Sequence, residues 1–201
     1  MNFLAHIYLS GDNELITIGN FIADGIKGKR YQNYPDVIQI GILLHREIDT
    51  FTDAHPTVRL STKRLHHRYS HYSGVIIDIL YDHFLAKNWS SYSDTPLNIY
   101  VDDFYESLRQ HSELLPLRIQ NMMPYMLADN WLFNYANIDG IQNVLNGMNR
   151  RTKNIVGMDR ATDELQEFYQ EFETEFTSFF DELRVFSDEK LTALKLDYAL
   201  K

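Results

Sequence analysis

Cysteine is absent from the 201 residues of this sequence. Without thiols the chain can form neither disulfide bonds nor thiolate metal sites, and it has no cysteine nucleophile. Any metal ion that the protein binds must therefore be held by histidine nitrogens and carboxylate oxygens.

A long hydrophobic run is also missing. Residues 74–85 form the most apolar stretch, and they are interrupted by Asp78, Asp82 and His83. No segment approaches the roughly 20 apolar residues that a helix needs to span a bilayer. The first residues lack the basic and apolar segments of a signal peptide. We therefore expect a soluble, cytoplasmic protein that does not bind membranes.

Basic residues are outnumbered, and the formal net charge is -9. This balance argues against broad binding to nucleic acid or to anionic membranes. Most of the excess acid lies in residues 159–190, which we interpret as a solvated helix face. Residues 54–77, by contrast, contain no acidic residue and four basic ones: Arg59, Lys63, Arg64 and Arg68. This basic segment is either a solvated face as well or a dock for phosphate or an acidic protein.

The hydrophobic pattern predicts helices throughout the chain. Apolar residues recur at intervals of three and four, and few segments alternate as strands do. The composition, 44% hydrophobic and 13% aromatic, is that of a chain able to bury a core. We predict an all-α, single-domain helical bundle over residues 1–201. The expected helices span 3–9, 13–27, 35–54, 57–68, 73–88, 96–111, 115–128, 138–150 and 160–186.

Acidic residues and histidines interrupt two of the apolar helices. His45 and Asp49 lie four residues apart and so share one helix face, where they could grip one cation. Asp78 and Asp82 have the same spacing, and His83 follows directly. Carboxylates among residues that should be buried are costly unless they are paired or bind metal.

These residues, together with Asp24 before the flexible Gly25, form the predicted metal site. The full set is Asp24, His45, Asp49, Asp78, Asp82 and His83. Such donors suit manganese, iron, zinc or magnesium. A divalent ion held this way can polarise a phosphoryl oxygen and activate a water molecule for attack. Nearby cations would hold the phosphate and offset charge in the transition state, and the candidates are Lys27, Arg46, Arg59 and Arg64.

The same pattern permits a purely structural interpretation. His45 and Asp49 could form an intrahelical pair, and Asp82 could pair with Arg46 or Arg68. The protein would then be a helical bundle with buried ion pairs and no catalytic site.

Four segments carry a resemblance to a known family. They are MNFLAH at 1–6, GNFIADGIKG at 19–28, LHREIDTFTDAHP at 44–56 and GVIIDILYDHFLA at 74–86. In this order they closely resemble the bacterial acyl carrier protein phosphodiesterases. A weaker similarity continues through Asn130-Trp131-Leu132, Tyr135, Gly140 and Arg150-Arg151 and thins after about residue 155.

The resemblance implies hydrolysis of the phosphodiester that joins 4'-phosphopantetheine to a serine of holo acyl carrier protein. It implies manganese as the cofactor, with magnesium or iron as alternatives, and a role in fatty-acid synthesis. It also implies a fold like that of the HD-type metal phosphohydrolases. No His-Asp dipeptide occurs in this chain, however, and the adjacent pair is reversed as Asp82-His83. The HD ligand order therefore cannot be transferred residue by residue.

We also assign expected roles to individual residues. Asp24, His45, Asp78 and Asp82 would lie nearest the metal ion, with Asp49 and His83 as further ligands or as groups that orient them. Protonation of the leaving oxygen would fall to His6 or His55, with Arg46 beside them as a catalytic cation.

The protein substrate fits the charge pattern, because acyl carrier proteins are small and acidic. The expected substrate-binding residues are Lys27, Arg59, Lys63, Arg64 and Arg68. Two other functions remain open. One is an HD-like phosphohydrolase acting on a nucleotide or other small phosphodiester, and the other is a non-catalytic module that binds an acidic protein.

Overall fold

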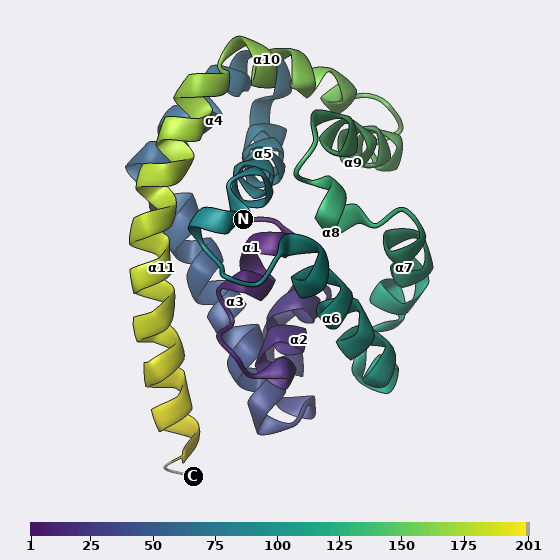
Figure 1. Ribbon diagram of the computed structural model, residues 1–201, viewed down its shortest axis with the longest axis vertical. Coiled ribbons are helices and arrows are strands. Elements are labelled where there is room, and N and C mark those ends of the chain that lie inside the picture. Colours follow the sequence, from purple (N-terminus) through teal and green to yellow (C-terminus); the bar gives the residue numbers. More distant parts are fainter. Residues whose placement is uncertain (200–201) are drawn as a thin grey trace.

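A computed structural model describes residues 1–199, and its elements in this range are helices without a β-strand (Figure 1). The all-α prediction is therefore confirmed. Residues 200 and 201, the end of the predicted domain, lie outside the described part. The α-helices are α1 (Phe3–Tyr8), α2 (Glu14–Ile22), α3 (Asp36–Ala54), α4 (Pro56–Tyr69), α5 (Ser73–Lys87), α6 (Leu97–Gln110), α7 (Leu117–Ala128), α8 (Trp131–Asn134), α9 (Ile138–Arg151), α10 (Ala161–Glu167) and α11 (Tyr169–Ala199). Across these residues no helix has the length and apolar character to cross a membrane.

Two helices end elsewhere than expected, and α8 lies between the helices expected at 115–128 and 138–150, where none was predicted. The helix predicted at 13–27 ends at Ile22, where a 3-10 turn, η1 (Ala23–Gly25), turns the chain and leaves Asp24 exposed. The helix predicted at 160–186 is split after Glu167 into α10 and α11. Helix α11 then runs on to Ala199, because Leu191 is still buried near Gly11 and extends the apolar stripe.

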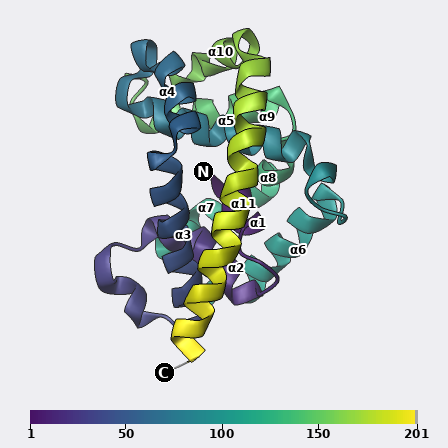
Figure 2. The ribbon, with the colours of Figure 1, turned by 90° about the vertical axis from the view of Figure 1, so that its left-hand side faces the viewer.

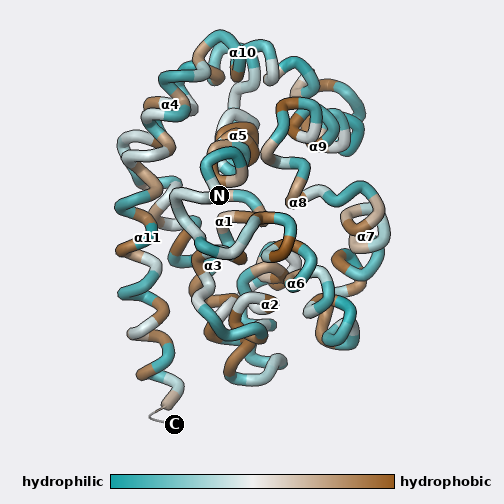
Figure 3. The backbone as a smooth tube through the Cα atoms, viewed as in Figure 1, coloured by the Kyte–Doolittle hydropathy of each residue, from teal (hydrophilic) through white to brown (hydrophobic). Residues whose placement is uncertain are grey.

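Helix α11 runs along one side of the molecule, beside α3 and α4 (Figures 1 and 2). Its buried residues are those of the apolar stripe seen in the sequence: Phe172, Phe176, Phe179, Phe180 and Leu183. Hydrophilic residues alternate with this stripe along the helix, as the hydropathy colouring shows (Figure 3). The stripe therefore packs α11 onto the core that is shared with α3, α4 and α5.

Helices α2 and α3 cross with their backbones in close contact. This crossing positions the functional site. A Cβ on Gly41 would lie 2.1 Å from the carbonyl oxygen of Ile16, and one on Gly19 would lie 2.3 Å from that of Ile38. Only glycine permits this approach. Because Asn20 directly follows Gly19 and His45 lies one helical turn beyond Gly41, the crossing brings these two polar side chains together.

We predict that Gly41→Ala destabilises the fold by about 1–3 kcal/mol, because the added methyl group forces two backbones apart. Chemical denaturation of the variant measures this loss. Gly74→Ala is the matched control, since a Cβ at Gly74 would meet nothing within 4 Å. Its stability should stay within about 1 kcal/mol of wild type or rise slightly. Equal stability of both variants would contradict the close crossing.

Candidate metal centre

Three side chains from α1 and α3 converge at the α2–α3 crossing. One ligand atom from each of His6, His45 and Asp49 lies within 4.8 Å of the other two. The Nε2 atom of His6 is 3.2 Å from Asp49 Oδ1, and the Nε2 atom of His45 is 3.1 Å from Asp49 Oδ2. Asp24 joins them from η1, with its Oδ1 atom 3.3 Å from His45 Nε2. These four residues form a mixed imidazole and carboxylate cluster, which we call the His-Asp cluster.

Asn20 orients both imidazole rings. Its side-chain nitrogen donates to the carbonyl oxygen of His6 and to Ser10 Oγ, both at 2.9 Å, so its oxygen must face the rings. That oxygen lies 2.9 Å from His6 Nδ1 and 3.2 Å from His45 Nδ1. Each ring therefore donates its Nδ1 hydrogen to Asn20 and presents Nε2 to the carboxylates. Fixing one ring nitrogen in this way is what ligand histidines require.

The electrostatics of the cluster favour a cation at its centre. Burial, with the neighbouring His45, lowers the pKa of His6 to about 4, so this ring is neutral at pH 7. Its unprotonated Nε2 then faces a carboxylate oxygen, and two lone pairs oppose each other at 3.2 Å. The two rings are also stacked with their centroids 3.9 Å apart, which disfavours a second positive charge.

The other members of the cluster are charged. Burial would lower the pKa of His45, but hydrogen bonds with Asp24 and Asp49 raise it to about 9. Burial would likewise raise the pKa of Asp49, but the hydrogen bond from His45 holds it well below its usual range. The hydrogen bond with His45 also lowers the pKa of Asp24. Two anionic carboxylates and two imidazole nitrogens thus meet, and this donor set fits a divalent cation such as manganese, zinc or iron.

The structure does not bring Asp82 and His83 into this cluster. The buried carboxylate of Asp82 accepts hydrogen bonds from the backbone N–H groups of Leu4, at 2.7 Å, and Ala5, at 3.2 Å. It therefore anchors the N-terminus of α1, the helix that carries His6. Burial raises its pKa to about 7. Asp82 thus holds in place the helix that carries His6, and it is not itself a member of the His-Asp cluster.

His83 has both ring nitrogens occupied by protein groups. Its Nδ1 atom lies 2.8 Å from the carbonyl oxygen of Tyr135, and its Nε2 atom lies 2.9 Å from the hydroxyl of Tyr169. Asp78 is different, because it lines the same cavity as the cluster while binding the α-amino group of Met1 at 2.9 Å. The four-residue spacing in α5 thus places Asp78 near the site and Asp82 against α1.

The predicted catalytic residues Arg46 and His55 have structural partners. Arg46 donates hydrogen bonds to the carbonyl oxygens of Ile26 and Gly28. These bonds fix the position of the loop that follows Asp24. His55 accepts from the N–H of Thr57 at the start of α4, and its other nitrogen lies 3.3 Å from Glu182. Only His6, of the two predicted proton donors, belongs to the cluster.

The basic segment of α4 pairs with the acidic helices α10 and α11. Arg64 binds Glu175, and Arg68 binds Glu164. Among the other predicted substrate-binding residues, Arg59 donates to the backbone oxygen of Asp53, while Lys27 and Lys63 are exposed. The two charged regions that the sequence separates are therefore partners in the fold, and two arginines of the predicted dock are already engaged.

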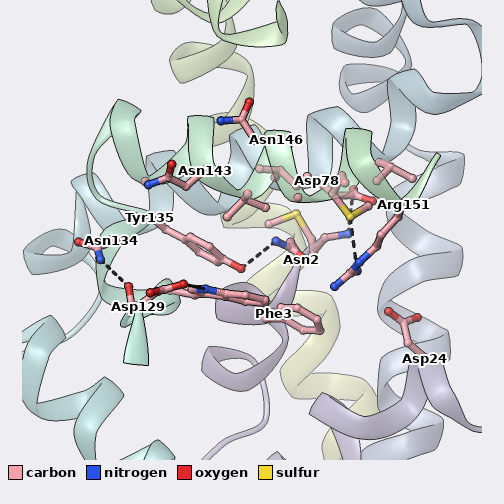
Figure 4. Close-up of a pocket in the computed structure, with 18 of the residues that line it drawn as sticks. Asn2, Phe3, Asp24, Asp78, Asp129, Asn134, Tyr135, Asn143, Asn146 and Arg151 are labelled. Carbon is pink, nitrogen blue, oxygen red and sulfur yellow. Dashed lines mark hydrogen bonds and ion pairs between the residues drawn. The ribbon is translucent and has the colours of Figure 1, made fainter. Parts of the chain in front are cut away.

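A cavity of about 810 Å³ opens from the His-Asp cluster (Figure 4). At one end it is lined by Asp24, His45 and Asp49, and its walls come from residues 1–3, α5, α8 and α9. Three exposed arginines also line it: Arg118, Arg150 and Arg151. None of the three is among the site residues that the sequence predicts, although Arg150 and Arg151 lie in the weaker family similarity.

Comparison with known proteins gives one family. Residues 1–183 match the family model described as acyl carrier protein phosphodiesterase, which extends beyond the point where the sequence similarity was expected to thin. A protein of that name from Pectobacterium atrosepticum is 31% identical over 90% of this chain and 94% of its own. Those from Salmonella agona and Escherichia coli (strain K12 / DH10B) are 33% and 34% identical over the same shares. No solved structure matches, so the resemblance to HD-type enzymes stays a prediction.

We predict that Asp82→Ala destabilises the protein by about 1–3 kcal/mol, because two buried N–H groups lose their acceptor. Chemical denaturation measures the difference. Asp102→Ala, at an exposed position of α6, is the control and should stay within about 0.5 kcal/mol of wild type. Unchanged stability of Asp82→Ala together with lost metal binding would instead indicate that Asp82 is a metal ligand, as the sequence predicts.

Proposed function

This chain belongs to the acyl carrier protein phosphodiesterase family, and from that membership we propose that it hydrolyses the phosphodiester between 4'-phosphopantetheine and the serine of holo acyl carrier protein. The products are apo acyl carrier protein and 4'-phosphopantetheine. The observation that supports the proposal most strongly is the His-Asp cluster at the end of a cavity lined by arginines.

The proposed cofactor is a divalent ion, manganese first, with magnesium or iron as alternatives. His6, His45, Asp49 and Asp24 would hold it through the two Nε2 atoms and the carboxylate oxygens. When bound, such an ion supplies Lewis acidity toward a phosphoryl oxygen and lowers the pKa of water. The support for this proposal is the convergence of both histidine Nε2 atoms on the two carboxylates, with both Nδ1 atoms held by Asn20.

In the proposed reaction, a water oxygen forms a bond to phosphorus and the bond from phosphorus to the serine oxygen breaks. A proton goes to that serine oxygen, and the phosphate leaves on the pantetheine. The phosphodiester carries one negative charge, and more charge gathers on its oxygens in the transition state. Arg118, Arg150 and Arg151 line the cavity and can offset this charge.

The same arginines offer a surface for the acidic protein substrate. They are exposed near the cluster, and none of them forms a salt bridge within residues 1–199. The arginines of α4, by contrast, are partly neutralised by Glu175 and Glu164. We therefore propose that the carrier protein docks against the mouth of the cavity, with its serine directed at the His-Asp cluster. This position shifts the expected dock away from α4.

Intact-mass spectrometry of holo acyl carrier protein tests the reaction. Wild-type protein with manganese should convert the holo mass to the apo mass, and EDTA should prevent the conversion. Asp49→Ala should lower the rate by about a hundredfold or more, because the carboxylate that faces both Nε2 atoms is gone. Asp102→Ala should keep the wild-type rate. Retention of the holo mass with folded, manganese-loaded protein would refute the proposal.

Charge reversal at two exposed positions distinguishes the two possible docks. Arg151→Glu should raise the KM for holo acyl carrier protein by roughly tenfold at low ionic strength, and added salt should shrink the difference. Lys63→Glu makes the same charge change on α4 and should leave KM within about twofold. The opposite result in steady-state kinetics would place the dock on α4.

A further inference from the structure

The cavity is much larger than the site of hydrolysis requires. A phosphate group needs only the end at the His-Asp cluster, yet the cavity of about 810 Å³ continues along α8 and α9. Its volume falls within the roughly 300–1,000 Å³ of pockets that enclose drug-sized ligands. The wall formed by α8, residues 143–148 of α9 and residues 2 and 135, which we call the amide wall, has no role in the mechanism above.

The amide wall mixes side-chain amides with apolar groups (Figure 4). Its amides are Asn2, Asn134, Asn143 and Asn146, and its apolar or aromatic members are Trp131, Tyr135, Val144 and Met148. Asn2 donates to the hydroxyl of Tyr135 at 3.2 Å, and Asn134 donates to the backbone oxygen of Asp129 at 2.7 Å. Asn146 accepts from the side chain of Gln142 at 2.9 Å, so three of the four amides are held in place. Such a wall suits a slender ligand that alternates amides with short apolar segments.

Gly147 of α9 lines this wall, and no close contact requires a glycine at this position. A Cβ on Gly147 would meet only the guanidinium of Arg150, at 3.8 Å. Gly140, two helical turns earlier, is different, because a Cβ there would lie 2.0 Å from the carbonyl oxygen of Asn134. Glycine inside a helix is less stable than alanine by about 1 kcal/mol. At Gly147 nothing in the described protein offsets this loss, and the residue lines the cavity.

We propose that the amide wall binds the pantetheine arm of the substrate and that Gly147 leaves the space through which the arm passes. This inference rests on the proposed function. The arm carries two amides, a hydroxyl and a dimethyl group between its phosphate and its thiol, so its polar and apolar segments match those of the wall. With the phosphorus at the His-Asp cluster and the protein at the mouth, the arm lies along α9.

The binding of the arm makes the amide wall a determinant of specificity. A small phosphodiester without the arm reaches the cluster but leaves the wall empty. Blocking the wall should therefore affect the two kinds of substrate differently, whereas damage to the cluster affects both. This difference separates the arm-binding site from the site of hydrolysis.

The test compares Gly147→Leu with wild type on holo acyl carrier protein and on bis(4-nitrophenyl) phosphate. The variant should lose roughly tenfold or more in kcat/KM on the carrier protein and stay within about twofold on the small diester. Free pantetheine should inhibit wild-type hydrolysis of the small diester, and the variant should resist this inhibition. Gly74→Leu, in α5 and outside the lining of the cavity, should behave as wild type on all three measurements.

Asn143→Leu provides a second route if Gly147→Leu does not fold, because Asn143 is exposed and lines the same wall. It should show the same selective loss on the carrier protein. Equal kinetics of folded Gly147→Leu and wild type on holo acyl carrier protein would overturn the inference while leaving the proposed function intact. Failure of wild type to act on holo acyl carrier protein would instead refute the proposed function.

Discussion

The backbone contact between α2 and α3 at Gly19 and Gly41 is the constraint on which the site depends. It sets Asn20 against the rings of His6 and His45, and the single amide oxygen of Asn20 then fixes both Nδ1 atoms. Each ring must consequently turn its Nε2 atom toward Asp49. A side chain at either glycine would widen the crossing, and the shared acceptor would no longer reach both rings. Backbone packing therefore decides the chemistry of the cluster.

Charge separation along the sequence serves helix placement in the fold. Helices α10 and α11 carry the acidic residues, and they meet the cations of α4 and α5 through Arg64–Glu175, Arg68–Glu164 and Lys87–Glu173. Partly exposed ion pairs of this kind contribute little to stability individually. They can nevertheless select one register of α11 against its neighbours, because the apolar stripe alone tolerates sliding. A further consequence is that Arg64 and Arg68 are engaged by the fold, whereas Arg118, Arg150 and Arg151 line the cavity without a salt bridge in the described part of the chain.

The sequence was informative where neighbours along one helix decide the outcome. Helical periodicity predicted the helices other than the short α8, and the spacing of His45 and Asp49 predicted their meeting on one face of α3. The identical spacing of Asp78 and Asp82 was less informative, because α5 is buried on nearly all sides and periodicity cannot tell which neighbour each face meets. Asp82 faces α1, and His83 faces Tyr135 and Tyr169.

Contacts between distant segments were beyond the reach of sequence patterns. The pairing of α4 with α11 depends on tertiary packing, as does the entry of Arg118 and Arg151 into the cavity. His6 shows the same limit. The sequence predicts it as a proton donor, and only the packing of α1 against α2 and α3 brings it to Asn20 and Asp49. Spacing within a helix predicts local pairs, whereas a site built from several helices depends on their crossings.

The amide wall and the His-Asp cluster are separate parts of one cavity, and this separation affects how such an enzyme would select its substrate. Metal clusters of histidine and aspartate act on phosphoesters of many kinds, so the cluster by itself gives little discrimination. Binding energy from a part of the substrate that does not react can be used to position the reacting phosphorus. An arm held along α9 would fix the phosphodiester from one side while the carrier protein fixes it from the other. Diesters lacking either attachment would be oriented less well, and the specificity would then reside in the walls of the cavity and the chemistry in the cluster.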